Sequence, residues 1–574
     1  MRKLDLLKEH ATGIIIAVVV GLIIALPPIV FRWSSDYQGF DMLKTNTEAH
    51  YVAQVQEVYD GHLALGNPFF ADLKNEPYLF PPIGPLVIGL IGRFLGLGAI
   101  EAVMLLRFVI TSAMAFFIYL FTRELASNKW AGLIAAPFVM LGYSLLDPSY
   151  ILEFFRDPSR AADFIDYGRP VNPQFSSLLF FAYLFFFWRA LHRLDKSSWR
   201  YALVSVLILG ASFYTYLFTW TFILSLNGFL SLVYISQKDW TRVKRIVGIS
   251  AGAAILGLPY LLYVLDVSRH PWYAESARRF GFVALRVPNV SRMIVAITIL
   301  FIVVRKWFAR PSRLFFIAFF STAFFVVNEQ LITGQYVFNH HYHWYYSTPL
   351  AIVFLSVTAV TLIDRAIRKE RWQREICLVL VLLFLSHGVA RQVNAYKTVL
   401  GEMKREQRYA ALFSWLNQNT PKDTTVFASE KISNYLPALT HNNVYYHGTG
   451  IYTLVPDERL SHGYLLYNYL DGVATSSARE FMDRDRGHIS AFVFGYTYSF
   501  IPGVCYGCFP DQFFDQLVAR YQSITDDRFI AELKKYQVDY IVWDRQANPT
   551  WRVDRFGLPI AVEFNSGQVV YEVK

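Results

Sequence analysis

"ATGIIIAVVVGLIIALPPIVF" (residues 11–31) contains no charged side chain and is long enough to cross a membrane. A helix needs about 20 consecutive apolar residues to span the hydrocarbon core of a bilayer. The stretch follows the basic residues 1–10, but it is too long for a removable signal peptide and has no small-residue cleavage site. It therefore predicts a transmembrane anchor.

The composition extends this interpretation to most of the chain. Of the 574 residues, 54% are hydrophobic and only 17% are charged, whereas a soluble chain carries about 25% charge. The net charge of +10 would indicate nucleic-acid binding only if the basic residues gathered on a soluble face. They do not gather there, so we expect a polytopic α-helical membrane protein with no nucleic-acid partner.

Further apolar runs of similar length predict ten more spans. They lie at 101–122, 130–146, 175–192, 200–217, 218–236, 246–265, 290–306, 313–331, 347–364 and 375–391. With the first run they predict about eleven transmembrane helices. The Gly-rich run 82–98 opens on prolines and is interrupted by Arg93, so we expect it to lie along the membrane surface as an interfacial helix.

The short basic loops then fall on one side of the membrane. They are Arg123 with Lys129, 189–200, 237–245, 305–313 and 364–374. The positive-inside rule places these loops and the N-terminus in the cytoplasm. Residues 32–100, 147–174, 266–289, 332–346 and the tail after Gln392 are expected outside. We expect a multi-pass protein of the plasma membrane of a prokaryote.

Two domains follow from this pattern: a transmembrane domain over 1–394, with a long first external loop at 32–100, and an extracytoplasmic domain over 395–574. In the tail, strand-length runs such as 424–430, 538–544 and 568–574 alternate with helical stretches such as 526–537, which is typical of a small α/β domain. Its "CYGC" suggests a local Cys505–Cys508 disulfide, although a metal site with two further ligands is an alternative.

Titratable side chains concentrate in the external loops. In "TNTEAH" (45–50), Glu48 follows Thr45 by three residues. One interpretation is a capping box, in which Glu48 only closes the start of a helix. The other is a catalytic carboxylate at the membrane surface, with Asp36 and Asp41 nearby. Apolar residues recur at helical spacing after Glu48, so we expect this helix to lie on the membrane with His50, Gln54 and Glu57 toward water.

A second cluster precedes the span at 347–364. His340, His341 and His343 stand in "NHHYHWYYS". They are either the polar tips of an aromatic belt or donors to an anion, since histidine can donate to phosphate oxygens. Zinc binding is the less favoured reading. Arg169, from an external loop that also holds Asp166, and Glu329 lie on the same predicted face, where a lipid-linked phosphate would meet them.

The arrangement resembles the GT-C superfamily of polytopic glycosyltransferases, which includes oligosaccharyltransferase catalytic subunits, protein mannosyltransferases and aminoarabinose transferases. "TEAHYVAQVQEVYDGH" (47–62), "DYGRPVNPQFSS" (166–177) and "FYTYLFTW" (213–220) carry the resemblance. It implies that Glu48 heads the first-loop helix as catalytic base or ligand. Asn172 and Gln174 stand where an oligosaccharyltransferase has an acidic pair, and the tail has no WWDYG motif.

The resemblance implies an inverting transfer of a sugar from a polyprenyl-phosphate donor to an external acceptor, which is a lipid, a glycan or a protein. Glu48, Asp36 and Asp41 would supply the base, while His340, His341, His343 and Arg169 would bind the donor phosphate. Asp166 and Glu329 would contact the acceptor or a divalent cation, magnesium or manganese. The alternatives are a transporter or flippase of a lipid-linked substrate, and a non-catalytic cell-envelope assembly protein. Span interiors nearly free of charge favour chemistry at the external surface over transport.

Overall fold

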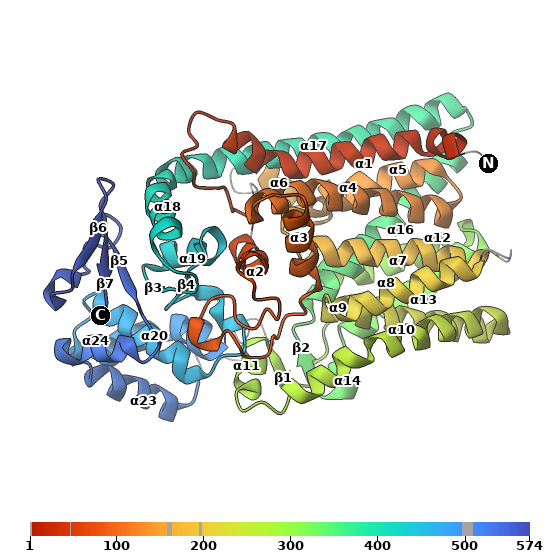
Figure 1. Cartoon of the computed structure of the whole chain (residues 1–574). Helices are drawn as coiled ribbons and strands as arrows, with labels where there is room; N and C mark the ends of the chain where they lie inside the picture. The colour runs from red at the N-terminus through yellow and green to blue at the C-terminus, as the bar shows by residue number, and fades with distance from the viewer. Residues whose placement is uncertain (1–2, 46, 158–162, 194–197, 496–508, 574) are drawn as a thin grey trace.

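A bundle of long helices and a smaller C-terminal α/β part make up the molecule (Figure 1). The computed structural model describes residues 3–45, 47–157, 163–193, 198–495 and 509–573. The predicted CYGC segment lies outside these ranges. In Figure 1 the N-terminus and the C-terminal part lie at opposite ends of the bundle.

A helix stands at each of the expected spans. These helices are α1 (Lys3–Arg32), α4 (Ala99–Ala126), α5 (Lys129–Leu141), α7 (Gln174–His192), α8 (Ser198–Phe213), α9 (Leu217–Ser236), α10 (Trp240–Val267), α12 (Arg292–Val304), α13 (Arg310–Val326), α16 (Thr348–Ala366) and α17 (Glu370–Glu406).

By length and composition, seven helices of the described chain can cross a membrane. The helices α5, α8, α12 and α13 are shorter than the ~20 residues of a full span. A membrane protein of several spans is thus confirmed, and the number eleven stays a prediction.

The basic loops meet at the end of the bundle where α1 begins. Arg123 donates to Glu9 and, at 2.9 Å, to His10 Nδ1. Asn128 donates to Asp364 at 3.2 Å, and Arg310 donates to Gln237 at 2.6 Å. These contacts agree with the expectation that the basic loops share one side. Which side of the membrane that is stays a prediction.

The expected interfacial helix is α3 (Ile83–Phe94), which packs between α2 (Glu48–Asp60) and α4. Its glycines allow the close approach: a Cβ atom on Gly89 would lie 2.7 Å from Val58 Cβ. Residues larger than glycine would therefore separate α3 from α2.

The C-terminal part is built on a five-stranded mixed sheet in the order β4-β3-β5-β7-β6. Its strands are β3 (Thr425–Phe427), β4 (Asn443–Val444), β5 (Tyr540–Asp544), β6 (Ile560–Glu563) and β7 (Gln568–Glu572). β3 is parallel to β4 and β5, whereas β7 is antiparallel to β5 and β6. The strands expected within 424–430, 538–544 and 568–574 are all present.

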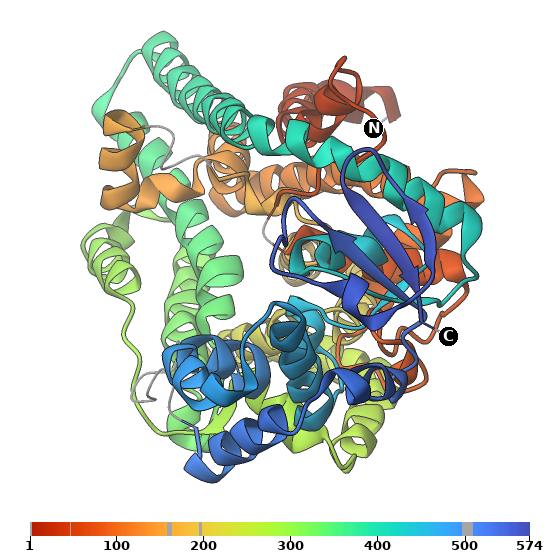
Figure 2. The same ribbon diagram turned by 90° about the vertical axis from the view of Figure 1, so that its left-hand side faces the viewer.

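Helices complete the C-terminal part. They are α18 (Ala410–Asn419), α19 (Glu430–Leu439), α20 (Asp457–Leu470), α21 (Ala478–Arg484), α22 (Arg486–Ile489), α23 (Asp511–Gln522) and α24 (Asp526–Lys534). Figure 2, viewed from this end of the molecule, shows the sheet beside α18 and α19. The helix α17 continues through the expected boundary at residue 394 to Glu406, so a single helix joins the two parts.

The loop between α1 and α4 and the tail share one hydrophobic core. Phe40, Val52 and Phe69 of the loop belong to the same buried cluster as Val426 and Tyr445 of the tail. Main-chain bonding continues this contact, since Val444 N donates to Phe69 O at 2.8 Å. The tail is therefore seated on the first loop.

This seating corrects the expected orientation of α2. His50, Gln54 and Glu57 do not face water but are buried, and His50 Nδ1 lies 3.1 Å from Thr449 Oγ1 of the C-terminal part. Glu57 forms an ion pair there with Lys74. The residue pattern of one helix carries no sign that distant parts of the chain cover its polar side.

Candidate functional site

A cavity of about 1310 Å³ lies where the helix bundle meets the C-terminal part. Both parts contribute to its wall, which is mainly aromatic and aliphatic. The bundle and its loops contribute, among others, Tyr51, Tyr78, Phe80, Tyr216, Phe218, Tyr260, Tyr263, Phe282, Trp344 and Tyr345; the C-terminal part contributes Glu430, Asn434, Gly448, Thr449, Tyr452, His488 and Phe492. A large apolar cavity with few polar groups is typical of a ligand site.

Arg169 brings a buried cation to the wall of this cavity. Only 8% of the residue is exposed. Its Nε donates to Asn172 O at 2.6 Å, and its terminal nitrogens donate to Thr47 Oγ1 at 3.2 Å and Tyr345 OH at 2.8 Å. The Tyr51 ring lies 5.6 Å from the guanidinium carbon. These contacts fix the plane of the guanidinium, so it is oriented before a ligand binds.

The three histidines divide into two groups. His340 and His341 line the cavity, whereas His343 is not among the described lining residues. His341 Nδ1 lies 2.7 Å from Tyr216 OH, and its ring is 5.5 Å from that of Tyr345, the residue bonded to Arg169. The structure thus brings His341 and Arg169 to one region of the wall.

His50, which the sequence analysis did not select, connects this region to the C-terminal part. Gln54 Nε2 lies 3.0 Å from His50 Nε2 and must donate to it, so the proton of the neutral ring is on Nδ1, 3.1 Å from Thr449 Oγ1. Burial, reinforced by the charge of Arg169, lowers the pKa of His50 to about 3. His50 is therefore neutral near pH 7 and adds no second cation beside Arg169.

Glu48 is not among the described residues that line the cavity. It is 1% exposed and forms an ion pair with Arg107 of α4, which is 3% exposed. One half of the expected capping box is present, because Thr45 N and Oγ1 donate to Glu48 Oε2 at 2.9 and 2.6 Å. However, α2 begins at Glu48 itself, with Thr47 at the N-cap. This geometry favours the structural interpretation of Glu48.

The other selected carboxylates also lie away from the described lining of the cavity. Asp36 is paired with Lys404 at 3.0 Å. Asp41 lies 3.7 Å from Arg32 Nε, and its Oδ1 is buried without a hydrogen-bond partner among the described residues. Asp166 is exposed, and both carboxylate oxygens of Glu329 are buried without a described partner.

Asp41 gives a pH-dependent prediction. Burial raises its pKa from 3.8 to about 6, although the charge of Arg32 opposes the shift. The folded protein therefore binds more protons than the unfolded chain between pH 4 and 6, and the free energy of unfolding falls as the pH rises through this window. We expect Asp41→Asn to remove this slope and to stabilise the protein by ~2–3 kcal/mol at pH 7.5.

Thermal unfolding at several pH values checks this expectation. Asp36→Asn is the matched control, because Asp36 is one-third exposed and its pair with Lys404 should contribute only about 0–1 kcal/mol. An Asp41→Asn variant with the wild-type pH profile would show that Asp41 is ionised at no cost in the folded protein.

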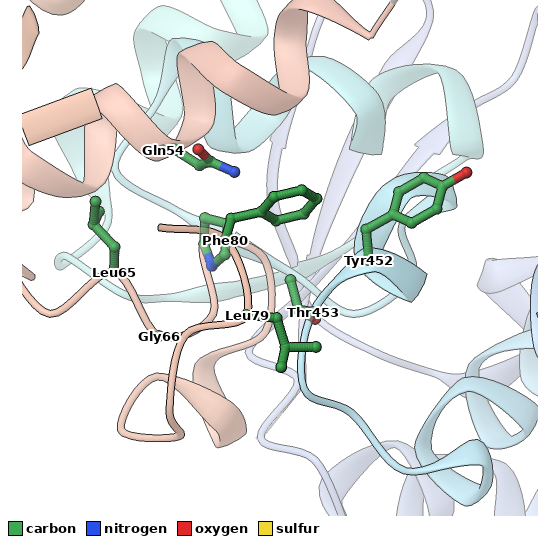
Figure 3. A pocket seen from close by; sticks show the side chains of 8 residues that line it. Gln54, Leu65, Gly66, Leu79, Phe80, Tyr452 and Thr453 are labelled. Atoms are coloured by element: carbon green, nitrogen blue, oxygen red, sulfur yellow. The ribbon is translucent and has the colours of Figure 1, made fainter. Parts of the chain in front are cut away.

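A second, smaller pocket adjoins the cavity, with Leu79, Phe80 and Tyr452 lining both. Figure 3 shows Phe80 between Gln54 and Tyr452. The smaller pocket, with a volume of about 10 Å³, has room for roughly one water molecule. The larger cavity is therefore the candidate site.

Several residues of the wall escaped the sequence analysis. Glu430 is the single carboxylate among the described lining residues, and no local motif marks it. Arg107 did carry a signal, because an arginine inside an apolar span is expected to have a specific partner.

Among the described residues, no three His, Cys, Asp or Glu side chains are placed to hold a metal ion. A divalent cation, magnesium or manganese, stays a prediction.

Comparison with known proteins finds similarity only at the level of structure. No protein-family model and no curated protein matches the sequence. The chain is similar to the Archaeoglobus fulgidus oligosaccharyltransferase in its apo form, with 12% identity and a TM-score of 0.47 over 94% of this chain and 70% of that one. It is also similar to ArnT from Cupriavidus metallidurans bound to undecaprenyl phosphate, with 12% identity and a TM-score of 0.47 over 96% and 97% of the two chains.

Proposed function

We propose that the chain is a membrane glycosyltransferase that takes a sugar from a polyprenyl-phosphate donor and transfers it to an acceptor on the external face. One observation carries the proposal: a buried, oriented arginine, Arg169, lies in the wall of a 1310 Å³ aromatic cavity between a membrane bundle and a second domain. A lipid-linked phosphate needs both features, an anion-binding group and an apolar channel for its tail.

Arg169 suits the phosphate because a guanidinium binds phosphate oxygens through charge-assisted, often paired, hydrogen bonds. His341, beside Tyr345, adds a further polar group. The polyprenyl chain of the donor would meet an apolar surface along the end of α10, where Tyr260, Tyr263 and Val264 line the cavity. The cavity also exceeds the ~300–1,000 Å³ of ordinary small-molecule sites, which leaves room for a sugar.

The proposed reaction is a displacement at the anomeric carbon. An acceptor oxygen or nitrogen forms a bond to this carbon, the carbon–oxygen bond to the phosphate breaks, and the acceptor proton leaves to a base. Arg169 stabilises the negative charge that grows on the departing phosphate, which is the group whose interaction strengthens toward the transition state. Attack opposite the phosphate inverts the anomeric centre.

The proposal predicts that Arg169→Gln weakens the binding of undecaprenyl phosphate by ~10- to 100-fold, because hydrogen bonds to a charged group contribute about 1.5–3 kcal/mol. Binding of undecaprenol, which has no phosphate, should change little. Titration of the purified protein in detergent with the two lipids measures both effects.

Arg391→Gln is the matched control for this experiment. Arg391 is also buried and donates to neutral oxygens, Asp163 O at 2.8 Å and Ser144 Oγ at 2.6 Å, but it is not among the described lining residues. It should leave phosphate binding unchanged. Equal weakening by the two variants, or unchanged binding in Arg169→Gln, would contradict the proposed role. Translocation of the lipid without cleavage of a sugar–phosphate bond would identify a flippase instead.

A further inference from the structure

Side chains of the C-terminal part converge on Gly448 in the wall of the cavity. A Cβ atom placed on Gly448 would lie 3.3 Å from Glu430 Oε1, 3.6 Å from Phe492 Cε2 and 3.7 Å from Asn434 Oδ1. All four residues line the cavity. The absent side chain of Gly448 thus leaves a recess bounded by a carboxylate, an amide and an aromatic ring.

The sides of this recess are held in place. Glu430 and Asn434 are four residues apart on α19, so both project from the same face of that helix. The Phe492 ring stacks on Tyr446 at 4.8 Å and on His488 at 5.3 Å between ring centroids. The recess therefore presents two polar side chains from one helix beside a stacked aromatic ring.

We infer that this recess is the subsite for a neutral carbohydrate acceptor, an inference that rests on the proposed function. Carboxylate and amide oxygens accept hydrogen bonds from sugar hydroxyl groups, and the amide also donates. An aromatic ring offers apolar contact to the C–H groups of a sugar ring. The negative charge of Glu430 disfavours a phosphorylated or carboxylated ligand in the same recess.

The position relative to Arg169 assigns the recess to the acceptor rather than to the donor. Arg169 belongs to the bundle, whereas Glu430 belongs to the C-terminal part, and both line the cavity. His50 contacts Thr449, the neighbour of Gly448, and the adjacent Tyr51 ring lies beside the Arg169 guanidinium. In an in-line displacement the nucleophile approaches from the side opposite the leaving phosphate. Glu430 is then placed to accept the proton of the attacking hydroxyl group while the carbon–phosphate oxygen bond breaks.

Saturation-transfer NMR with the purified full-length protein tests the subsite. The probes are the methyl glycosides of glucose, mannose, galactose and N-acetylglucosamine. In the wild type we expect a saturation-transfer signal from at least one of these glycosides, and we expect Gly448→Ala to abolish it. Glu430→Gln should bind the glycoside about 10-fold more weakly, because a hydrogen bond to a charged group is removed. Gly448 lies outside the left-handed backbone region, so alanine fills the recess without backbone strain. Glu480→Gln, an exposed carboxylate away from the cavity, is the control.

Three outcomes would overturn the inference. One is the absence of transfer to every glycoside, and another is transfer that Gly448→Ala and Glu430→Gln leave unchanged. The third is displacement of the glycoside by undecaprenyl-phosphate glucose at a concentration that saturates its own binding, since this would assign the recess to the donor sugar. Binding of undecaprenyl phosphate, measured in the same variants, should persist. A wild-type protein that binds a glycoside but does not bind undecaprenyl phosphate would refute the proposed function without contradicting the sugar subsite.

Discussion

Glu48→Gln should lower the free energy of unfolding by about 3–5 kcal/mol, because it leaves the buried guanidinium of Arg107 without its carboxylate. Both partners are almost fully buried, so water cannot replace the lost charge. The contacts from Thr45 to Glu48 would persist in part, since glutamine also accepts hydrogen bonds. The effect should therefore come from the ion pair rather than from the cap.

Thermal unfolding of the variant in detergent measures this loss. The double variant Glu48→Leu with Arg107→Met is the control, because replacing both members of a buried pair with apolar residues of similar size is often neutral or stabilising. Its stability should return most of the way to that of the wild type. A Glu48→Gln variant that unfolds like the wild type but transfers sugar ~100-fold more slowly would instead identify Glu48 as the general base.

The second large effect is expected at the contact between α11 and the C-terminal part. Asp457, at the start of α20, forms ion pairs with both Arg278 and Arg279 of α11 (Tyr273–Arg279). Arg279 is fully buried, and it also donates to Ile451 O at 3.2 Å and Ser276 Oγ at 2.9 Å. Asp457→Asn should cost ~3 kcal/mol, because a buried cation loses its counter-charge. Hydrogen exchange should accelerate in 273–279 and 451–457, where the two parts meet.

Arg278→Gln separates this effect from the loss of an ordinary surface pair. The Arg278 side chain is 22% exposed, and its Nη2 lies 2.5 Å from Asp457 Oδ2. A partly solvated pair contributes about 0–1 kcal/mol, so the melting temperature should hardly change. If both variants were equally mild, the charge of Arg279 would have to be compensated by neutral acceptors such as Ile451 O and Ser276 Oγ.

The sequence could predict the helices of the bundle because each span carries its own apolar signal. It could also predict strands β3, β5 and β7, whose β-branched and aromatic runs are local. It could not predict that the first loop and the tail share a core, because Phe69 and Val444 are hundreds of residues apart in the sequence and meet only in the fold. The sequence places His50 in water for the same reason, because its contact Thr449 lies in the tail.

The residues of the candidate site likewise divide into those that the sequence could indicate and those that only the fold reveals. Arg169 and His341 could be selected from sequence, because an arginine and a group of histidines in loops predicted to share one face can donate to phosphate oxygens. Glu430, Asn434 and Gly448 could not, because none of them belongs to a recognisable pattern and their meaning comes from the cavity they share. Glu48 fits its capping motif in part, but its partner Arg107 lies on another helix.

A structure of the protein with undecaprenyl phosphate bound would decide whether the cavity is the donor site. We expect the phosphate within hydrogen-bond distance of the Arg169 guanidinium, inside the cavity between the bundle and the C-terminal part, with the polyprenyl tail along the end of α10. A phosphate bound elsewhere, with Arg169 still bonded only to groups of the protein, would contradict this expectation.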